Sequence, residues 1–413
     1  MPWREPERDL SIIGRPDVLV VGGGCAGVAA ALAAARRGAD TWLVERSGIV
    51  GGLATVGLIN LLLTLDDGAG TQVVAGICQE FVDRMTAAGR AVAPDRAQWN
   101  SEDPGLVRFW KEAGLVWGAP ESVRYSVAYD PESFVDVSYE LLRAAGVRLC
   151  LHSLFATAYT DGGRVVAAVL ESKRGREVVV PFVVVDATGD ADVAAACGAP
   201  LELEPIPPHL WFRVGGVEPD ADLGPFSFRT LDRGRILVPW GPHPNRVDPT
   251  DPDSMTAAEL ECRLAARQAF EGMRAGIRGW SDAWIDDYAR MLGITESRRL
   301  VGRYVMTKAD ADQAMADAVA RTGHWTRRAV WFDIPFRSLT TDAVSNLVVA
   351  GRCISTTRYV HQATKEIPAA MATGEAAGAA AALAAGSGSS VLEVQIESLR
   401  RDLSAAGAIV GGA

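Results

Sequence analysis

The sequence contains few cysteines, and no two of them form a C-x-x-C pair. Its six cysteines are scattered between Cys25 and Cys353 in a chain of 413 residues. This scatter argues against a zinc ribbon, an iron–sulfur cluster or a thioredoxin-like dithiol. We therefore expect reduced, mostly buried thiols in a cytoplasmic protein.

An excess of positive charge is also missing. Lysine and arginine total 41 against 51 aspartates and glutamates, which gives a net charge of -10. An acidic surface repels phosphate backbones and anionic lipid headgroups. We therefore expect no nucleic-acid partner and no membrane association.

One uncharged run of 18 residues, from Val18 to Ala35, has the length of a signal peptide or a short membrane span. It contains four glycines arranged as a turn, and the residues before it are charge-balanced instead of basic. A buried strand that leads into a buried helix has this composition. The length of the whole chain predicts two domains that share an interface.

Gly22, Gly24 and Gly27 form a G-x-G-x-x-G motif between a β-branched run and an alanine-rich stretch. Gly22 permits a tight turn, Gly24 lets backbone approach a pyrophosphate, and Gly27 lets helix and strand pack closely. Glu45 ends the next predicted strand, where its carboxylate can accept hydrogen bonds from both ribose hydroxyls and would repel a 2′-phosphate. The alternative is an ordinary glycine-rich turn with Glu45 as a surface charge.

Strand and helix patterns alternate along much of the chain. Strands are predicted at 17–21, 40–45, 147–151, 154–160, 164–171, 176–180, 182–186 and 346–351, and helices at 26–37, 72–88, 131–145 and 368–385. The first two strands form a parallel β-α-β unit with the helix between them, and the four strands from 147 to 180 form a small meander. Residues 90–128 lack periodicity and are rich in Trp, Pro and Gly, which indicates an insertion that is either an apolar substrate cap or a dimer interface. Residues after Gly386 are expected to fray.

Several segments resemble the FAD-dependent oxidoreductase family of the glutathione-reductase-like superclass. These segments are G-G-G-C-A-G at 22–27, V-G-G-L-A-T at 50–55, D-A-T-G-D-A-D at 186–192, G-I-T-E-S-R-R at 293–299 and V-A-G-R-C-I-S at 349–355. The resemblance extends over roughly residues 17 to 385. Because well-separated segments converge on one cofactor, the ligand is long, and the resemblance implies FAD.

The resemblance implies an α/β fold with a Rossmann-type FAD-binding domain and an inserted α+β substrate domain. The FAD domain would comprise 17–200 and 340–386, the substrate domain 201–339, and a C-terminal tail 387–413. The residues that would contact FAD are Gly22, Gly24, Cys25, Ala26, Gly27, Glu45, Arg46, Gly51, Gly52, Leu53, Ala54, Thr55, Ala187, Thr188, Gly189, Asp190, Gly351, Arg352 and Ile367.

The candidate catalytic residues lie mainly in a polar segment, 359–366, which we predict to be a loop between a core strand and a core helix. His361 is the first candidate for proton transfer because imidazole titrates near neutral pH, with Tyr359 and Lys365 behind it. The alternative is a structural histidine. Arg298 belongs to a predicted helical arginine cluster that either holds a carboxylate or the flavin, or forms an ion-pair network.

The helix that begins near Pro368 points its N-terminus back toward this segment. If that end faces the flavin N1 and C2 carbonyl, its partial positive charge stabilises anionic reduced flavin. A structural interpretation is compatible with this one: Gly374 and Gly378 let the helix pack tightly against the first predicted helix.

The leading hypothesis is an enzyme that transfers a hydride between a small organic substrate and the flavin N5, as a dehydrogenase, oxidase or double-bond reductase. There is no second G-x-G-x-x-G between a strand and a helix, so an external electron acceptor or donor is expected. The alternatives are an FAD-dependent monooxygenase and a non-catalytic nucleotide-binding scaffold subunit. The sequence leaves the oligomeric state open, with a homodimer as one alternative.

Overall fold

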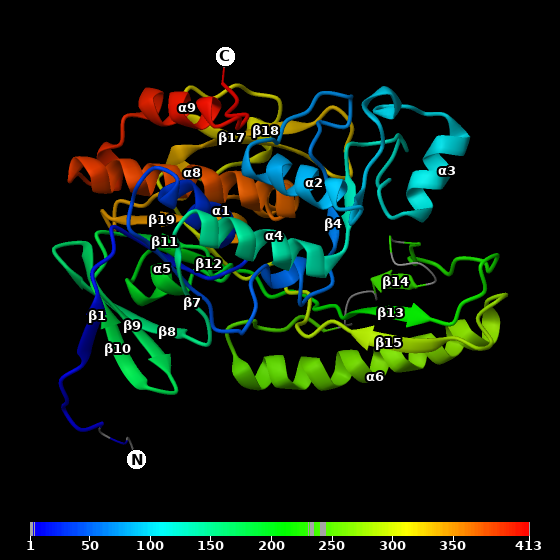
Figure 1. Ribbon diagram of the computed structural model, residues 1–413, viewed down its shortest axis with the longest axis horizontal. Coiled ribbons are helices and arrows are strands. Elements are labelled where there is room, and N and C mark those ends of the chain that lie inside the picture. The colour runs from blue at the N-terminus through cyan, green and yellow to red at the C-terminus, as the bar shows by residue number, and fades with distance from the viewer. Residues whose placement is uncertain (1–2, 4, 230, 232–234, 240–244, 413) are drawn as a thin grey trace.

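Five parallel strands form the central sheet (Figure 1). The computed structural model describes residues 3, 5–229, 231, 235–239 and 245–412. The strand order is β19 (Leu347–Val349), β11 (Val183–Asp186), β2 (Val18–Val21), β3 (Thr41–Val44) and β7 (Arg148–Cys150). Helix α1 (Cys25–Ala35) connects β2 to β3, which pair in parallel, so the predicted β-α-β unit is confirmed.

Both faces of this sheet are covered. Val18, Val20 and Leu43 pack into the core that contains α1 and α8 (Ile367–Ser387). The alternating residues Leu19 and Val44 pack into a second core on the opposite face. Strands buried on both faces need an apolar side chain at every position, which explains the uncharged run that begins at Val18.

Helices α1 and α8 lie in close contact because glycines in α8 face the backbone of α1. A Cβ atom on Gly374 would lie 2.1 Å from the Ala26 carbonyl oxygen, and one on Gly378 would lie 2.0 Å from that of Ala30. The tight packing predicted for these glycines is confirmed. By length and composition α8 could cross a membrane, but 83% of that stretch is buried inside the fold, as in a core helix.

A mixed, mostly antiparallel sheet covers the face of the central sheet opposite α1. Its order is β1 (Ser11–Gly14), β10 (Gly175–Val179), β9 (Arg164–Ser172) and β8 (Leu154–Asp161). Three of the four strands predicted for the meander, β8, β9 and β10, do pair with one another in this sheet. The prediction for 147–151 was wrong in its partner, because β7 instead pairs in parallel with β3 at the edge of the central sheet.

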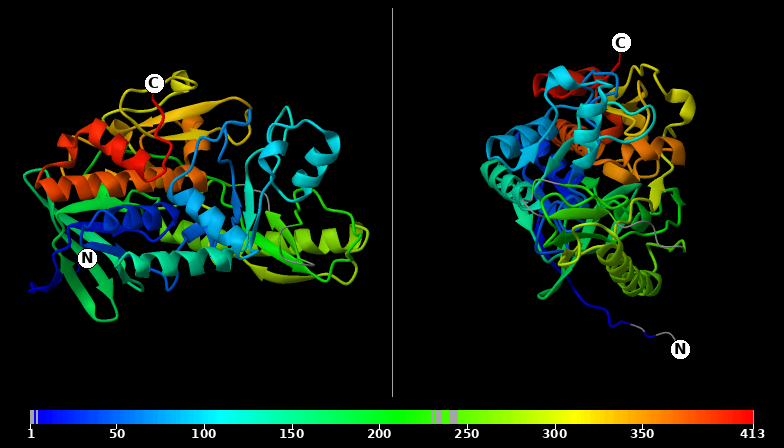
Figure 2. Two further views of the ribbon diagram at one scale, coloured as in Figure 1. Left: turned by 45° about the horizontal axis from the view of Figure 1, so that its top comes forward. Right: turned by 90° about the vertical axis from the view of Figure 1, so that its right-hand side faces the viewer.

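A separate, fully antiparallel sheet lies beside the two sheets described above. It packs against the long helix α6 (Pro252–Gly276), as Figures 1 and 2 show. Its order is β14 (Ile236–Pro239), β13 (Trp211–Gly215) and β15 (Trp284–Tyr288). Buried residues at every fourth position of α6, from Ala258 to Phe270, pack against this sheet. The division into domains at residues 200 and 339 stays a prediction.

The remaining elements connect these layers. They are β4 (Leu61–Leu62), α2 (Ile77–Ala87), β5 (Ala91–Val92), α3 (Pro104–Glu112), β6 (Val127–Tyr129), α4 (Pro131–Ala144), α5 (Asp192–Ala196), β12 (Leu201–Leu203), β16 (Arg298–Leu300), β17 (Ala318–Gly323), β18 (Trp331–Pro335), α7 (Arg358–Thr364) and α9 (Ile396–Ala405). Helix α4 begins as predicted, with Asp130 accepting a hydrogen bond from the Glu132 amide. The expectation of fraying after Gly386 was wrong: α9 packs near α8 through the buried Leu399 and Leu403 (Figure 1).

Candidate functional site

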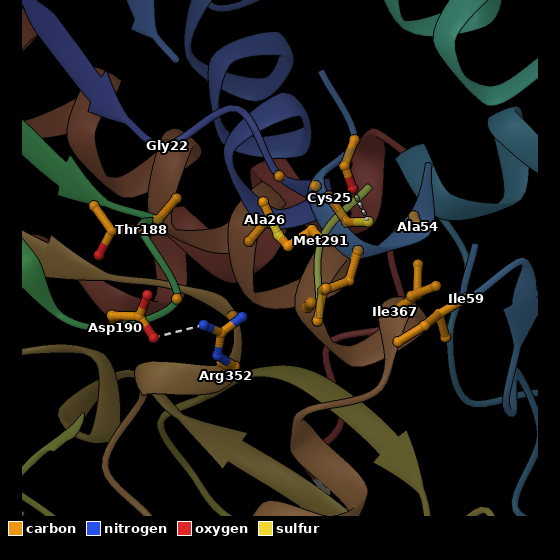
Figure 3. A pocket seen from close by; sticks show the side chains of 18 of the residues that line it. Gly22, Cys25, Ala26, Ala54, Ile59, Thr188, Asp190, Met291, Arg352 and Ile367 are labelled. Carbon is orange, nitrogen blue, oxygen red and sulfur yellow. Dashed lines mark hydrogen bonds and ion pairs between the residues drawn. The ribbon is translucent and has the colours of Figure 1, made fainter. Parts of the chain in front are cut away.

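A cavity of about 340 Å³ opens at the carboxyl ends of four strands of the central sheet. The residues directly after β2, β3, β11 and β19 all line it, together with the loop 51–54 and the start of α8. Ligands of open parallel sheets bind at this edge. In Figure 3 the polar pair Asp190 and Arg352 lies on the opposite side of the view from the apolar Ile59 and Ile367.

The glycine turn forms one wall of the cavity. Gly22 has φ +99°, and a Cβ atom there would lie 2.5 Å from the Ala187 carbonyl oxygen. A Cβ atom on Gly27 would lie 1.8 Å from the Gly22 carbonyl oxygen, so both glycines are required for packing. Gly24 differs, because a Cβ atom there would meet no protein atom within 4 Å. Packing does not require a glycine at position 24, whereas a ligand lying against the backbone would.

Glu45 is held at the end of β3 by backbone amides. Its Oε2 accepts a hydrogen bond from the Gly23 amide and its Oε1 accepts one from the Ser47 amide, both at 2.8 Å. A carboxylate has about four lone-pair sites, so the side chain, which lines the cavity, can accept two more hydrogen bonds. This arrangement suits the two hydroxyls of a ribose.

The loop after β11 is fixed from inside the fold. Asp186 is fully buried, and its Oδ2 accepts a hydrogen bond from the Ala194 amide at the first turns of α5 (3.0 Å). Burial raises the pKa of Asp186 above its usual value. Oδ1 of Asp186 accepts hydrogen bonds from the amide and hydroxyl of Thr188, which lines the cavity. The loop is therefore positioned by hydrogen bonds that do not involve a ligand.

Arg352, on the loop after β19, lies across the cavity wall. Its Nη2 is 2.6 Å from Asp190 Oδ1, and its guanidinium packs so closely on Gly189 that a Cβ atom there would lie 2.8 Å from it. Its buried Nε has no hydrogen-bond partner in the described part of the chain. An N–H that is buried without a partner is costly, so an acceptor from a bound molecule would satisfy it.

The structure brings together nearly all of the residues that were predicted to contact FAD. Seventeen of the nineteen line the cavity, and Gly27 and Thr55 do not. Thr55 is buried, and its hydroxyl donates to the Val50 carbonyl oxygen (2.9 Å), which closes the 51–54 turn. These two residues shape the wall from behind.

The predicted catalytic residues are not brought together. Lys365 lines the cavity, whereas His361, Tyr359 and Arg298 do not. The expected loop at 359–366 is mostly helix α7, whose backbone hydrogen bonds and buried faces accommodate its polar residues. The prediction that Arg298 lies in a helix is also wrong. Arg298 lies in strand β16, where its Nε donates to the Asp190 carbonyl oxygen (2.7 Å).

His361 is completely buried in α7. Its Nε2 is 2.8 Å from the Thr295 carbonyl oxygen, which can only accept, so Nε2 carries the proton. Burial lowers the pKa of His361 to about 3. A neutral imidazole held in this way does not line the cavity, but it is hydrogen-bonded to Thr295, which does. Tyr359 lies elsewhere, between the rings of His324 and Phe332.

Sequence reasoning missed the side chains at one end of the cavity. They are Ile59, Leu63, Trp117, His209, Trp211, Met291, Thr295, Trp325 and Glu366. Only the tryptophan-rich composition of 90–128 gave a signal, and Trp117 from that segment lines the cavity. The interpretation of the segment as an apolar substrate cap or a dimer interface stays a prediction. Burial lowers the pKa of His209 to about 4, so this cavity histidine is neutral at pH 7.

Comparisons with known proteins agree with this geometry. A family model described as FAD dependent oxidoreductase matches residues 17–248 and 227–403. Among curated proteins, no sequence matches this chain. A geranylgeranyl bacteriochlorophyll reductase-like protein from Thermoplasma acidophilum has a similar structure, with a TM-score of 0.51 and 15% identity over 94% of this chain and 83% of that one.

A second similar structure is that of p-nitrophenol 4-monooxygenase from Pseudomonas putida DLL-E4. Its TM-score is 0.53 and its identity 13%, over 92% of this chain and 83% of that one. At these identities, both likenesses show a shared α/β fold.

Proposed function

Because the chain belongs to the FAD dependent oxidoreductase family, whose members are enzymes with FAD as cofactor, we propose that it oxidises or reduces a small organic molecule in the cavity described above. Bound FAD would supply hydride transfer at its N5 atom. The observation that carries this proposal is the convergence of the glycine turn, Glu45 and the Asp190–Arg352 pair on one cavity.

The wall residues fit a dinucleotide. The open space at Gly24 and the N-terminus of α1 would hold the pyrophosphate, and Glu45 would hold the adenosine ribose. The unpartnered Nε of Arg352 would donate to an acceptor on the cofactor. We assign the fold to the glutathione-reductase-like subtype, with 201–339 as the substrate domain. Its support is a parallel sheet with helices on one face and a mixed, mostly antiparallel sheet on the other.

The start of α8 would stabilise negative charge on the cofactor. Ile367, the first residue of α8, lines the cavity, so the positive end of the helix dipole points into it. Lys365 Nζ is 2.6 Å from Glu366 Oε1, and both side chains are largely buried. This ion pair lies beside the cavity, and the neutral His209 lines the same space.

A monooxygenase is the second candidate reaction. The fold is shared with a reductase-like protein and with a p-nitrophenol monooxygenase at similar TM-scores, so it supports both chemistries. The two differ in the source of the electrons: a dehydrogenase or oxidase takes them from its substrate, whereas a monooxygenase needs an external reductant and inserts oxygen. Family membership argues against the non-catalytic scaffold.

An anaerobic experiment separates the two reactions. The FAD-loaded protein is mixed with a panel of alcohols and amines, and separately with NADH and NADPH followed by a panel of enones, while the flavin absorbance is followed. Bleaching by an alcohol or amine alone, or recovery of the absorbance of nicotinamide-reduced flavin when an enone is added, supports hydride transfer. Bleaching only by a nicotinamide, followed by ¹⁸O incorporation into a panel compound under ¹⁸O₂, would contradict it and identify a monooxygenase.

A further inference from the structure

Three tryptophans from distant parts of the sequence line the cavity together. Trp117 comes from the insertion before β6, Trp211 from β13, and Trp325 from the turn between β17 and β18. All three pack against the same apolar cluster, which includes Leu63. We call these three side chains the tryptophan wall.

The tryptophan wall has a defined geometry. The rings of Trp117 and Trp325 lie edge to face, with centroids 5.5 Å apart and an interplanar angle of 70°. The indole N–H of Trp117 donates to the Gly114 carbonyl oxygen (2.6 Å), which fixes that ring. Edge-to-face and offset contacts are the arrangements that aromatic rings prefer, so a further planar ring can join this pair.

The wall lies next to the start of α8. Lys365 Nζ is 5.7 Å from the centre of the Trp325 ring, and Ile367 lines the same cavity two residues later. On the other side, the His209 ring is 6.1 Å from that of Trp211. A molecule against the wall would therefore lie beside the helix end that we assign to the cofactor.

The charged groups near the wall are already paired. Lys365 is bound to Glu366, and Arg352 is bound to Asp190, each at 2.6 Å. The remaining lining cation, Arg46, is exposed beside Glu45 at the ribose end. Recognition of a carboxylate ordinarily uses an unpaired cation, and the described lining residues offer none at the wall.

Polar atoms without partners remain at this end of the cavity. Trp325 Nε1 and His209 Nδ1 are buried and have no hydrogen-bond partner among the described residues. An indole N–H can only donate, so Trp325 needs an acceptor. The neutral state of His209 means that it would not attract a negative charge.

From the wall, its paired charges and these polar atoms, we propose that the substrate is a neutral, planar aromatic molecule that carries a hydrogen-bond acceptor, bound against Trp117, Trp211 and Trp325. The proposal rests on the proposed function, since it assigns the substrate class of the same cavity. Apolar contact with Leu63 and Met291 would cover the ring. Aliphatic substrates and amino acids are disfavoured.

Calorimetric titration of the FAD-loaded protein tests this class with three matched probes: 2-naphthol, its saturated counterpart decahydro-2-naphthol, and 2-naphthoate. We expect 2-naphthol to bind at least about tenfold more tightly than either of the others. Equal or tighter binding of the saturated alcohol or of the carboxylate would overturn the proposal.

Variants locate the binding. Trp325→Leu and Trp117→Leu should each weaken 2-naphthol binding roughly fivefold or more, with the FAD content unchanged. Trp3→Leu, at a side chain that is 92% exposed, is the control and should change neither. If the wall variants lose FAD together with naphthol, the wall holds the flavin and the inference is wrong.

The FAD content of the wild-type sample, measured before each titration, distinguishes failure of the proposed substrate class from failure of the proposed function. A protein that contains FAD but does not bind 2-naphthol overturns the substrate class alone. A protein that holds no FAD overturns the proposed function, and the substrate class falls with it.

Discussion

Each glycine of the turn between β2 and α1 has its own physical role. Gly22 needs a positive φ and close contact with Ala187, and Gly27 lets α1 approach the turn. Gly24 has an ordinary φ of -69° and open space around its missing side chain. Gly24 is thus the residue at which binding of a cofactor and stability of the fold can be separated.

Gly24→Ala should lower FAD affinity at least about tenfold, because the added methyl group would occupy space beside the pyrophosphate. The free energy of unfolding of the FAD-free protein should change by less than about 0.5 kcal/mol, since no protein atom is displaced. FAD titration and denaturant unfolding measure the two quantities.

Two other glycines supply the controls. Gly386→Ala, also in open space but outside the cavity wall, should leave FAD affinity unchanged. Gly27→Ala should destabilise the FAD-free protein by more than about 2 kcal/mol through overlap with Gly22. Unaltered FAD affinity in Gly24→Ala would show that the ligand does not lie against this turn.

At the scale of elements, α8 is connected to α2 by a buried carboxyl group. Glu375 on α8 is 2% exposed, and its Oε2 accepts a hydrogen bond from the Ile77 amide at the start of α2 (2.9 Å). Burial raises the pKa of Glu375 to about 7, although the Ile77 amide and Arg37 oppose the rise. The carboxyl group therefore favours the protonated state more in the folded chain than in the unfolded chain.

This pKa predicts the pH dependence of stability. A raised folded-state pKa contributes stability that is complete below the unfolded value of 4.5 and is lost as pH rises through about 7. Glu375→Gln removes this loss, so it should be more stable than wild type at pH 8 by on the order of 2 kcal/mol. The difference in the free energy of unfolding is measured by denaturant unfolding of both proteins from about pH 5 to about pH 8, roughly the range over which the Glu375 carboxyl group titrates.

An exposed carboxylate on α9 provides the matched control. Glu397→Gln should follow the wild-type pH profile. A wild-type and a Glu375→Gln profile that run parallel across this range would show that Glu375 does not titrate there.

The sequence predicted those elements whose signals are local. The helix at Asp130 and Pro131 begins with a cap and a proline, and β2, β3, β11 and β19 are short apolar runs beside glycine turns. Helix α7 was missed because polar residues such as His361 were taken as a sign of a functional loop, whereas they lie in a helix and tertiary packing buries several of them. The partner of β7 was missed because strand patterns do not specify pairing.

At the scale of the whole molecule, the two ends of the cavity differed in how well they could be predicted. The cofactor end is built from contiguous motifs at the carboxyl ends of parallel strands, and the sequence located it. The tryptophan wall is assembled from residues 117, 211 and 325, which come together only in the folded chain. A lone tryptophan or histidine such as His209 carries no signal of its neighbours.

The most direct test of the account is an absorbance spectrum of the purified protein, followed by acid precipitation and identification of the released chromophore. We predict a yellow protein that releases FAD, in a ratio that approaches one per chain when FAD is added in excess. A yellow precipitate would mean covalent attachment of the same cofactor. A colourless protein that fails to bind added FAD would contradict the central claim.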